Sequence, residues 1–300
     1  MPETSAATDY LVGLIGSGIA PSLTPALHER EADELGLRYL YRRLDIDALG
    51  LPPTAVGDLL SAARLTGYRG LNITHPCKQL VLPFLDELSA EARALGAVNT
   101  VVFEADAIIG HNTDAPGFAA GLRRGLPGVR MDKLVQLGAG GAGSAVAHAL
   151  LGLGAGTLTL HDAEPSRAHG LAAALTGRFG PGRAVVSTGL ADAVTTADGL
   201  VNATPVGMWN HPGLPLPAEL LRPGLWVADV VYRPLDTELV RTARELGAPV
   251  LTGGPMAVFQ AAHAFALFTG REPDTDRMLR HFDTLTTPTP RGRHDAFAHS

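Results

Sequence analysis

Apolar residues in the first part of the chain fall into short runs that alternate with stretches of helical period. In chain order, the strand-like and helix-like segments are residues 10–15, 25–35, 38–44, 53–66 and 69–74. Pro25 suits the first position of its helix, and Thr24 is the predicted cap. The order strand, helix, strand, helix, strand predicts a parallel sheet covered by helices.

The pattern changes after this first sheet. A helix is predicted over residues 83–96, and its apolar face carries Leu85, Leu88, Ala92 and Leu95. Residues 96–102 and 107–110 then predict a β-hairpin. Asp114 follows the hairpin and stands at the start of a helix predicted to continue to Leu122.

Strand and helix patterns also recur through the second half of the chain. The strand-like segments there are residues 134–137, 157–160, 199–205, 225–232 and 249–252. A helix is predicted over residues 236–246. Gly253 and Gly254 are expected to interrupt the chain before a long apolar helix over residues 256–269. The length allows two domains of ordinary size, so the sequence predicts a two-domain α/β protein.

Composition narrows the class of protein. The 300 residues have a formal net charge of -6 and a pI near 6.0, which leaves no basic face for nucleic acid. No run approaches the roughly eighteen consecutive apolar residues of a membrane span, and we expect no secretion signal. Cys77 is the only cysteine, which excludes an internal disulfide and favours the cytoplasm. The histidines lack ligand spacing, so no metal site is predicted.

A glycine-rich turn opens the second half. Gly138, Gly140 and Gly143 have the G-x-G-x-x-G spacing, directly after a predicted strand and before an Ala-rich helix. Such glycines permit a tight turn and the close approach of a pyrophosphate, whose charge the helix N-terminus receives. The alternative is a structural turn between strand and helix. The context favours a dinucleotide-binding, Rossmann-like domain.

The residue after the next strand indicates which cofactor binds. Asp162 lies where an acidic residue binds the adenosine ribose hydroxyls in such domains. A carboxylate there repels a ribose 2'-phosphate, and Ala163 supplies no cation to hold one. The sequence therefore favours NAD over NADP. Arg167 and Arg178 are close enough in sequence to weaken this prediction, although a solvent-exposed helix face also accounts for them.

The segment from Leu71 to Lys78 is a short strand that ends at a proline and then presents a lysine. The chain contains only two lysines, Lys78 and Lys133, because arginine occupies every other Lys/Arg position. A retained lysine indicates a site that needs a compact, titratable amine. The alternative is that both lysines survived compositional drift. Ligands gather at the ends of parallel strands, which favours a functional role for this position.

Three other polar residues have both a functional and a structural explanation. Asp114 is a candidate site residue, but a carboxylate at a helix start also caps the helix. Asn99 is either a site residue or a turn residue. Gln260 is a polar exception in an apolar helix and must find either a ligand or partners in the core.

Seven motifs in this order resemble the shikimate and quinate dehydrogenase family, over residues 10–285. Besides the glycine loop at residues 138–144, they are Ser22-Leu23-Thr24-Pro25, Asn72-Ile73-Thr74-His75-Pro76-Cys77-Lys78, Gly96-Ala97-Val98-Asn99-Thr100, His111-Asn112-Thr113-Asp114, Asn202-Ala203-Thr204-Pro205-Val206-Gly207-Met208, and Gln260.

The resemblance implies a role for each matching position. Lys78 and Asp114 would be the catalytic pair at the hydroxyl that becomes a ketone. The residues implied to bind substrate are Ser22, Thr24, Thr74, Asn99, Tyr232 and Gln260. Those implied to bind the cofactor are Gly138, Gly140, Gly141, Ala142, Gly143, Asp162, Asn202, Thr204 and Met208.

The family architecture also implies where the domains divide. Residues 1–113 would form an N-terminal α/β substrate-binding and catalytic domain with a mostly parallel sheet, completed by C-terminal helices within residues 254–286. Residues 114–253 would form the Rossmann-like NAD-binding domain, and residues 287–300 are predicted to be a disordered tail. The sequence leaves the oligomeric state open, with a homodimer as one alternative.

Departures from the commoner biosynthetic pattern bear on the substrate and the cofactor. Thr24 replaces a serine, and Asp162-Ala163-Glu164 replaces Asn-Arg-Thr. Both changes, together with His75-Pro76, resemble the NAD-dependent quinate/shikimate dehydrogenase branch. Cys77 stands where relatives carry a bulkier residue, and its effect is open.

The reaction expected from this resemblance is reversible oxidation of quinate or shikimate to the 3-dehydro acid, with the hydroxyl proton passing to Lys78. One alternative is a dehydrogenase for amino-substituted shikimate analogues in a secondary pathway. Another is a non-catalytic binding protein that responds to NAD. The presence of both Lys78 and Asp114 disfavours this last alternative.

Overall fold

The structure is a computed structural model that describes residues 9–287, and it contains two sheets of six strands each. The strands of the first sheet are β1 (Tyr10–Gly16), β2 (Tyr39–Asp45), β3 (Gly70–Ile73), β4 (Glu87–Leu88), β5 (Thr100–Phe103) and β6 (Ile108–His111). Their spatial order is β2-β1-β3-β5-β6-β4. The strands β1, β2 and β3 are parallel, and β5 runs antiparallel to β3 and β6. The predicted parallel sheet and the hairpin therefore both occur.

The second sheet is parallel throughout. Its strands are β7 (Lys133–Leu137), β8 (Thr157–His161), β9 (Ala184–Val186), β10 (Gly199–Asn202), β11 (Trp226–Asp229) and β12 (Val250–Leu251). Their order is β12-β11-β10-β7-β8-β9, so that the chain reverses direction across the sheet between β10 and β7. Ligands of such sheets bind beyond the carboxyl ends of the strands at this reversal.

Helices cover both sheets. Around the first sheet lie α1 (Thr24–Glu34), α2 (Val56–Leu65), α3 (Cys77–Leu80) and α4 (Ala90–Leu95), with 3₁₀ turns η1 (Pro53–Ala55) and η2 (Leu82–Phe84). Around the second lie α5 (Asp114–Gly125), α6 (Gly141–Gly152), α7 (Pro165–Phe179), α8 (Leu190–Thr195), α9 (Glu238–Glu245) and the turn η3 (Ala218–Leu220). The chain ends with α10 (Gly253–Thr269) and α11 (Thr275–Thr286).

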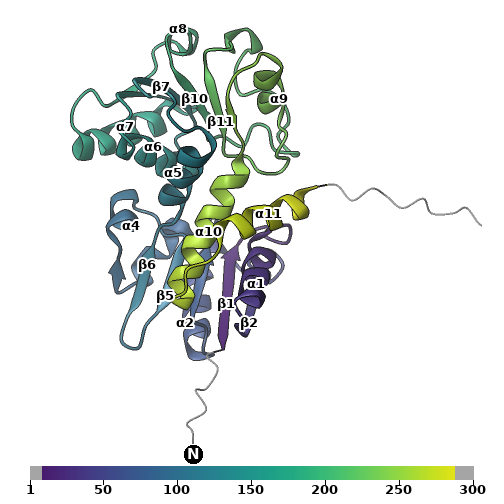
Figure 1. Cartoon of the computed structure of the whole chain (residues 1–300). Coiled ribbons are helices and arrows are strands. Elements are labelled where there is room, and N and C mark those ends of the chain that lie inside the picture. The colour runs from purple at the N-terminus through teal and green to yellow at the C-terminus, as the bar shows by residue number, and fades with distance from the viewer. Residues whose placement is uncertain (1–8, 288–300) are drawn as a thin grey trace, which may run out of the picture.

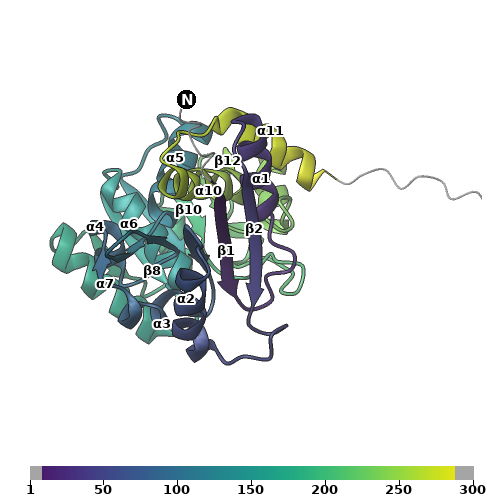
Figure 2. The same ribbon diagram turned by 90° about the horizontal axis from the view of Figure 1, so that it is seen from below.

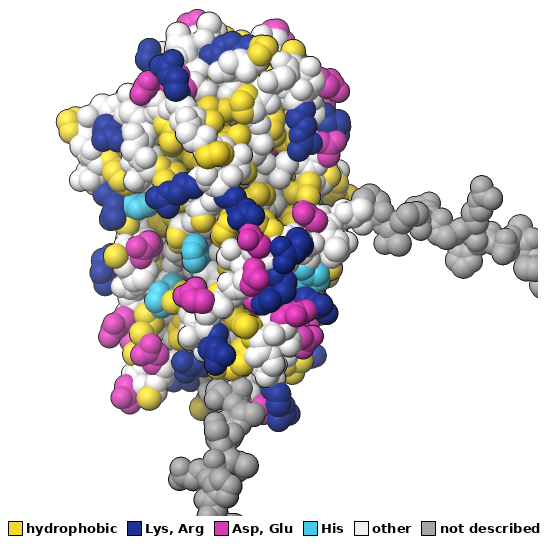
Figure 3. Space-filling model, in the orientation of Figure 1, with side chains coloured by type: hydrophobic (Ala, Val, Ile, Leu, Met, Phe, Trp, Pro, Cys, Tyr) yellow, Lys and Arg dark blue, Asp and Glu magenta, His cyan; other side chains and the backbone are white. Residues whose placement is uncertain are grey.

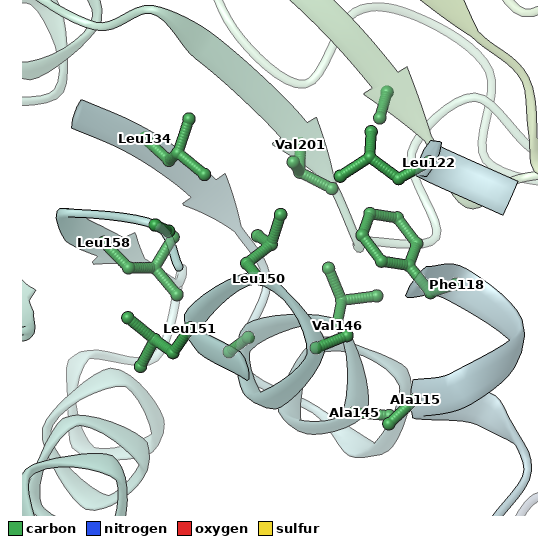
Figure 4. Packing of buried hydrophobic residues seen from close by; sticks show 14 of the residues in the cluster. Ala115, Phe118, Leu122, Leu134, Ala145, Val146, Leu150, Leu151, Leu158 and Val201 are labelled. Carbon is green, nitrogen blue, oxygen red and sulfur yellow. The ribbon is translucent and has the colours of Figure 1, made fainter. Parts of the chain in front are cut away.

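One core of the second lobe lies between α5, α6 and the sheet. Val146 and Leu150 of α6 point towards Leu134, Leu158 and Val201 on the strands (Figure 4). Each of these side chains is almost fully buried, and burial of one such side chain contributes about 1.5–3 kcal/mol. The packing holds the start of α6, and therefore the glycine loop, firmly against the sheet.

Helix α10 connects the two lobes, as its long run from one to the other shows in Figure 1, and the view from below shows it beside α5 (Figure 2). Two glycines of α5 permit its close approach: a Cβ atom added at Gly117 would lie 2.8 Å from the Cβ atom of Gln260, and one at Gly121 would lie 3.3 Å from Pro255. At the far end of α10, Phe268 packs over Gly70 of β3. This return of the chain brings Gln260 to the hairpin of the first lobe.

The predicted helix over residues 83–96 is wrong in its first half. Asp86 exchanges hydrogen bonds with Ile108, and β4 pairs with β6, so these residues join the sheet edge. The helix begins only at Ala90, where the Ser89 side chain accepts from the Ala92 N–H, and it ends at Gly96 as predicted. Leu85 and Leu88 still pack against the core. The spacing of these leucines is therefore compatible with either a helix or a strand.

Two smaller predictions also need correction. Helix α1 begins at Thr24 itself, with Leu23 in the cap position and no side-chain cap. Gly253 and Gly254 do not interrupt the chain, because α10 starts with them. A Cβ atom at Gly253 would lie 2.5 Å from the carbonyl oxygens of Val230 and Val231. Gly253 is therefore needed for close backbone packing.

The disorder predicted for residues 287–300 lies outside the described residues, except for residue 287.

The surface matches the charge balance of the sequence. On the face shown in Figure 3, Lys and Arg side chains are interspersed with Asp and Glu, without a continuous basic patch. Within the described part of the chain, no helix combines the length and hydrophobicity needed to cross a bilayer.

Candidate active site

Lys78 and Asp114 form an ion pair at the junction of the two lobes. Lys78 lies on α3, just after β3 ends, and Asp114 is the first residue of α5, which follows β6 and leads to the second lobe. The Lys78 Nζ atom lies 2.5 Å from Asp114 Oδ2. The Lys78 side chain is 23% exposed and that of Asp114 is 9% exposed.

The Asp114 carboxylate makes no capping hydrogen bond to its helix, and both of its oxygens bind side chains outside the helix. Its Oδ1 atom accepts a hydrogen bond from Asn99 Nδ2 at 2.9 Å, and its Oδ2 atom accepts from Lys78. The backbone N–H of Asp114 instead donates to Asn112 Oδ1 at 3.0 Å. Both carboxylate oxygens are therefore held in fixed directions next to the lysine.

Asn99 is the centre of this buried network of hydrogen bonds. Besides Asp114, its Nδ2 atom contacts Thr113 Oγ1 at 2.9 Å and Gln260 Oε1 at 3.3 Å. Its Oδ1 atom accepts from the Thr113 N–H at 2.8 Å. Only 3% of Asn99 is exposed. The residue thus links the hairpin of the first lobe, the start of α5 and the returning helix α10.

Sequence reasoning missed the polar residues behind Asn99. The Tyr41 hydroxyl donates to Asn72 Oδ1 at 2.7 Å, and Asn72 Nδ2 donates to Thr100 Oγ1 at 3.1 Å. Thr100 Oγ1 in turn donates to Asn99 Oδ1 at 3.0 Å. The available signal was a buried amide, Asn72, within an apolar strand. Buried polar groups require partners, and here the partners form a chain that leads to the ion pair.

The remaining predicted substrate residues make no hydrogen bond to this network within the described residues. The Thr24 N–H lies 3.4 Å from Ser22 Oγ, and Arg43 donates to the Ser22 carbonyl at 2.9 Å. Thr74 lies between β3 and α3, where its carbonyl accepts from the Cys77 N–H. Tyr232 follows β11 and packs near Phe282, and burial raises the pKa of its hydroxyl.

The glycine loop has the shape that a dinucleotide requires. Gly138 has a φ of +94°, and a Cβ atom at Gly143 would lie 2.3 Å from the Gly138 carbonyl oxygen. At Gly140 and Gly141 a Cβ atom would meet nothing within 4 Å, and α6 begins without a side-chain cap. The N-terminus of α6 is therefore open and is not covered by its own side chains. These residues fit the pyrophosphate of a dinucleotide.

Gln136 supports this loop and was not identified from the sequence. It is fully buried in β7, and its Nε2 atom donates to the carbonyl oxygens of Gly138 and Gly143 at 2.8 Å each. A polar residue inside an otherwise apolar strand was again the available signal. Its two bonds fix both ends of the turn.

Asp162 lies beside the glycine loop. Its Oδ2 atom accepts from the Ala139 N–H at 2.7 Å, and its Oδ1 atom accepts from the Glu164 N–H at 2.9 Å. Arg167 forms an exposed ion pair with Glu164 at 2.8 Å. The carboxylate is therefore oriented at the end of β8, next to the turn that would hold a pyrophosphate.

The segment after β10 also has an ordered geometry. Asn202 Oδ1 accepts from the backbone N–H and the hydroxyl of Thr204, at 3.1 and 2.7 Å. Its Nδ2 atom donates to the Val206 carbonyl at 2.9 Å, and the Met208 N–H donates to the Pro205 carbonyl. The predicted cofactor residues Asn202, Thr204 and Met208 thus belong to one folded loop. No cluster of three potential metal ligands occurs within residues 9–287.

Comparisons with known proteins agree with this geometry. Residues 14–101 match the family model of the shikimate dehydrogenase substrate binding domain, and residues 255–281 match that of the shikimate 5'-dehydrogenase C-terminal domain. A shikimate dehydrogenase (NADP(+)) of Streptomyces avermitilis is 66% identical over 272 residues, which cover 90% of this chain and 94% of that protein. The chain belongs to the shikimate dehydrogenase family.

Solved structures of shikimate dehydrogenase relatives share the fold. The quinate dehydrogenase of Corynebacterium glutamicum in complex with NAD has a TM-score of 0.87 and 47% identity, covering 92% of this chain and 99% of that one. Shikimate 5-dehydrogenase of Thermus thermophilus, in complex with NADP(H) and shikimate, has a TM-score of 0.81 and 38% identity, with coverage of 92% and 99%. The predicted family and the two-domain α/β fold are confirmed. The relatives differ in their nicotinamide cofactor.

Proposed function

We propose that this protein reversibly oxidises a ring secondary alcohol of quinate or shikimate to the 3-dehydro acid, with NAD as the hydride acceptor. The observation that carries the proposal is the ion pair of Lys78 and Asp114 at 2.5 Å, at the junction of the lobes and at the end of β3. A substrate acid with several hydroxyl groups suits the polar side chains around this pair.

The chain's own residues supply positioning and proton transfer. Asp114 and Asn99 hold the Lys78 amine in one direction. In its neutral form Lys78 Nζ takes the proton of the reacting hydroxyl during oxidation, and the resulting ammonium, paired with Asp114, returns that proton during reduction. General acid–base help of this kind contributes a factor of about 10² to 10⁴. The bound dinucleotide would supply the hydride chemistry. Asn99 and Gln260 are already hydrogen-bonded to each other, so they are fixed before substrate arrives.

The other proposed substrate contacts are inferred from where the residues lie in the fold. Ser22 and Thr24 lie on the segment between β1 and α1, and their short hydroxyl side chains suit the carboxylate or ring hydroxyls of the acid. Thr74 lies four positions before Lys78 in the sequence, and Tyr232 approaches from the second lobe. We assign substrate binding to residues 1–113 together with helices 254–286, and cofactor binding to residues 114–253.

The cofactor proposal rests on the charges near Asp162. Its carboxylate accepts two backbone hydrogen bonds beside the glycine loop, and such a fixed negative charge repels a ribose 2'-phosphate. The nearby guanidinium of Arg167 is paired with Glu164. These features favour NAD, although the Streptomyces relative is named for NADP.

The reaction is assigned to the cytoplasm, where the single cysteine stays reduced.

Neither alternative from the sequence gains support from the relatives described above, which are named as dehydrogenases of shikimate or quinate. The deciding experiment is a matrix of initial rates with quinate, shikimate and an amino-substituted analogue against NAD and NADP. We expect turnover of quinate or shikimate with NAD. Faster turnover of the amino analogue would favour the secondary-pathway enzyme, and no turnover of any acid with either cofactor would refute the proposed function.

A further inference from the structure

Asp229 is a buried acid to which neither the sequence motifs nor the proposed reaction gives a role. It is the last residue of β11, and only 2% of it is exposed. No ion pair involves this carboxylate in the described part of the chain. A buried carboxylate without a cation is costly unless hydrogen bonds compensate it. The hydrogen-bond partners of Asp229 therefore indicate its role.

Three donors satisfy the two oxygens of Asp229. Oδ1 accepts from Asn202 Nδ2 and from the Val231 N–H, each at 3.0 Å. Oδ2 accepts from the Thr237 hydroxyl at 2.7 Å. Asn202 is the last residue of the neighbouring strand β10, whereas Val231 and Thr237 belong to the segment after β11. One side chain thus joins two segments that leave the carboxyl edge of the sheet.

The first segment is the cofactor loop, residues 202–208. Asn202 determines its shape, because both ends of the Asn202 amide bind loop atoms of Thr204 and Val206. On the sheet side the Nδ2 atom of this amide also donates to Asp229, and this bond adds to those from the loop in holding the amide in one orientation. The position of the cofactor loop therefore depends on Asp229.

The second segment is the Tyr232 loop, residues 230–236. Asp229 binds the N–H of Val231, the residue immediately before Tyr232. At the other end, Thr237 accepts from the Val240 N–H at 3.2 Å and caps α9. The neighbouring Arg233 side chain donates to the carbonyl of Pro21 in the first lobe, next to Ser22. The loop thus reaches across to the segment that carries the proposed substrate hydroxyls.

The cofactor loop also lies close to the residues that flank the Tyr232 loop, Asp229 and Thr237. Gly207 has a φ of +107°, and a Cβ atom there would lie 3.2 Å from Thr237 Cγ2 and 3.8 Å from Asp229 Oδ2. The cofactor loop is therefore packed against the same Asp229–Thr237 pair that anchors the Tyr232 loop. A shift of the carboxylate would move both loops together.

We propose that Asp229 is a positioning residue that fixes the cofactor loop and the Tyr232 loop relative to each other. This inference rests on the proposed function, because it assumes that the two loops contact the cofactor and the acid substrate. Asp229 acts through Asn202 and Val231 and does not itself touch either ligand. Its loss should impair binding of both ligands at once.

An asparagine can replace the carboxylate, which provides a conservative variant. Burial raises the pKa of the Asp229 carboxyl to about 6, although the bonds from Val231, Thr237 and Asn202 oppose the rise. The site therefore requires acceptor atoms more than it requires charge. In Asp229→Asn the Oδ1 atom keeps the two acceptor bonds, and the new amide can donate to the Thr237 hydroxyl oxygen.

The test compares Asp229→Ala, Asp229→Asn and Thr237→Val with the control Asp198→Ala. Asp198 accepts from the Lys133 N–H at the opposite end of the strands, so its loss weakens the same sheet far from both loops. The measurements are the KM of acid and dinucleotide, kcat, the Kd of NADH, and the time-resolved fluorescence anisotropy of Trp209. This tryptophan is 78% exposed and follows the cofactor loop, whereas Trp226 is buried.

We expect Asp229→Ala to raise the KM of the acid and the Kd of NADH each by about tenfold, the usual effect of losing a buried hydrogen bond. The local motion of Trp209 should increase. Asp229→Asn should restore both values to within about threefold of wild type, Thr237→Val should shift both in the same direction, and Asp198→Ala should lower only the melting temperature.

Unchanged KM, Kd and anisotropy in folded Asp229→Ala would overturn the inference, because they would show a purely structural role. If Asp229→Ala does not fold, Thr237→Val decides the question in the same way. If the wild-type protein oxidises neither acid, the proposed function fails, but NADH binding and the Trp209 anisotropy still show whether Asp229 positions the cofactor loop.

Discussion

The amide of Asn99 donates to the Oδ1 atom of Asp114 at 2.9 Å, while the Oδ2 atom of the same carboxylate binds Lys78 at 2.5 Å. The two bonds leave the carboxylate no freedom to rotate away from the lysine. Asn99 therefore contributes to the orientation of the amine without contacting it.

Asn99→Ala should consequently lower kcat/KM by about tenfold or more, because it removes this support and leaves the buried Thr113 N–H without its acceptor. The same orphaned group should reduce the free energy of unfolding by about 1–3 kcal/mol. Steady-state kinetics and urea unfolding would measure the two effects. A loss of stability without any loss of kcat/KM would show that Asn99 is only structural.

Lys78→Ala should reduce kcat by at least about 10², the lower range for loss of a general acid–base group, while the Kd of NAD stays nearly constant. Lys133→Ala provides the matched control, since Lys133 is the other lysine of the chain and lies exposed at the start of β7. Initial rates and NADH fluorescence titration are the measurements. More than about a tenth of the wild-type rate in Lys78→Ala would contradict the assigned role.

Asp162→Asn combined with Ala163→Arg should shift the cofactor preference towards NADP. The double variant removes the charge that repels a 2'-phosphate and adds a guanidinium that can bind one. A charge-assisted hydrogen bond contributes about 1.5–3 kcal/mol, so the ratio of kcat/KM for NADP over NAD should rise by about tenfold to a hundredfold. Glu245→Gln, an exposed carboxylate at the end of α9, is the control. Strong NADP preference in the wild-type protein would already show that the role given to Asp162 is wrong.

His28 should make the protein sensitive to acid. It is fully buried, its Nδ1 atom lies 2.8 Å from the Tyr39 hydroxyl, and burial lowers its pKa from 6.5 to about 3. The unfolded chain therefore binds a proton between pH 6.5 and 3 that the folded chain does not, so the stability present above pH 6.5 is lost as the pH falls. The full loss is on the order of 5 kcal/mol.

His28→Gln tests this prediction, because it keeps a polar partner for Tyr39 and does not titrate. The unfolding free energy of this variant should fall less steeply with decreasing pH than that of the wild type, by up to about 1.4 kcal/mol per pH unit. His169→Gln, at an exposed position on α7, is the control. Identical pH slopes for wild type and His28→Gln would refute the assignment to His28.

Local patterns predicted most strands and helices because each depends on neighbouring residues. The error over residues 83–96 shows the limit of local patterns. Leu85 and Leu88 face the core in either conformation, and it is the pairing of Asp86 with Ile108 that favours a strand here. Spacing alone does not reveal a partner across the sheet. Gly253 was misread for the same reason, since its close neighbours are the Val230 and Val231 carbonyls.

The candidate site likewise has features that the sequence predicted and contacts that only the fold established. The sequence by itself determined that a lysine follows a strand end, that three glycines open a helix, and that Asp162 follows the next strand, because each feature lies within a few residues of chain. Only the tertiary structure decided that Asp114 binds Lys78 across 36 positions, and that Asn99 contacts Gln260 across 161 positions. Hydrogen-bond partners of buried polar groups depend on how distant segments pack, and that packing brings Asn202, Asp229 and Thr237 together at the carboxyl edge of the second sheet.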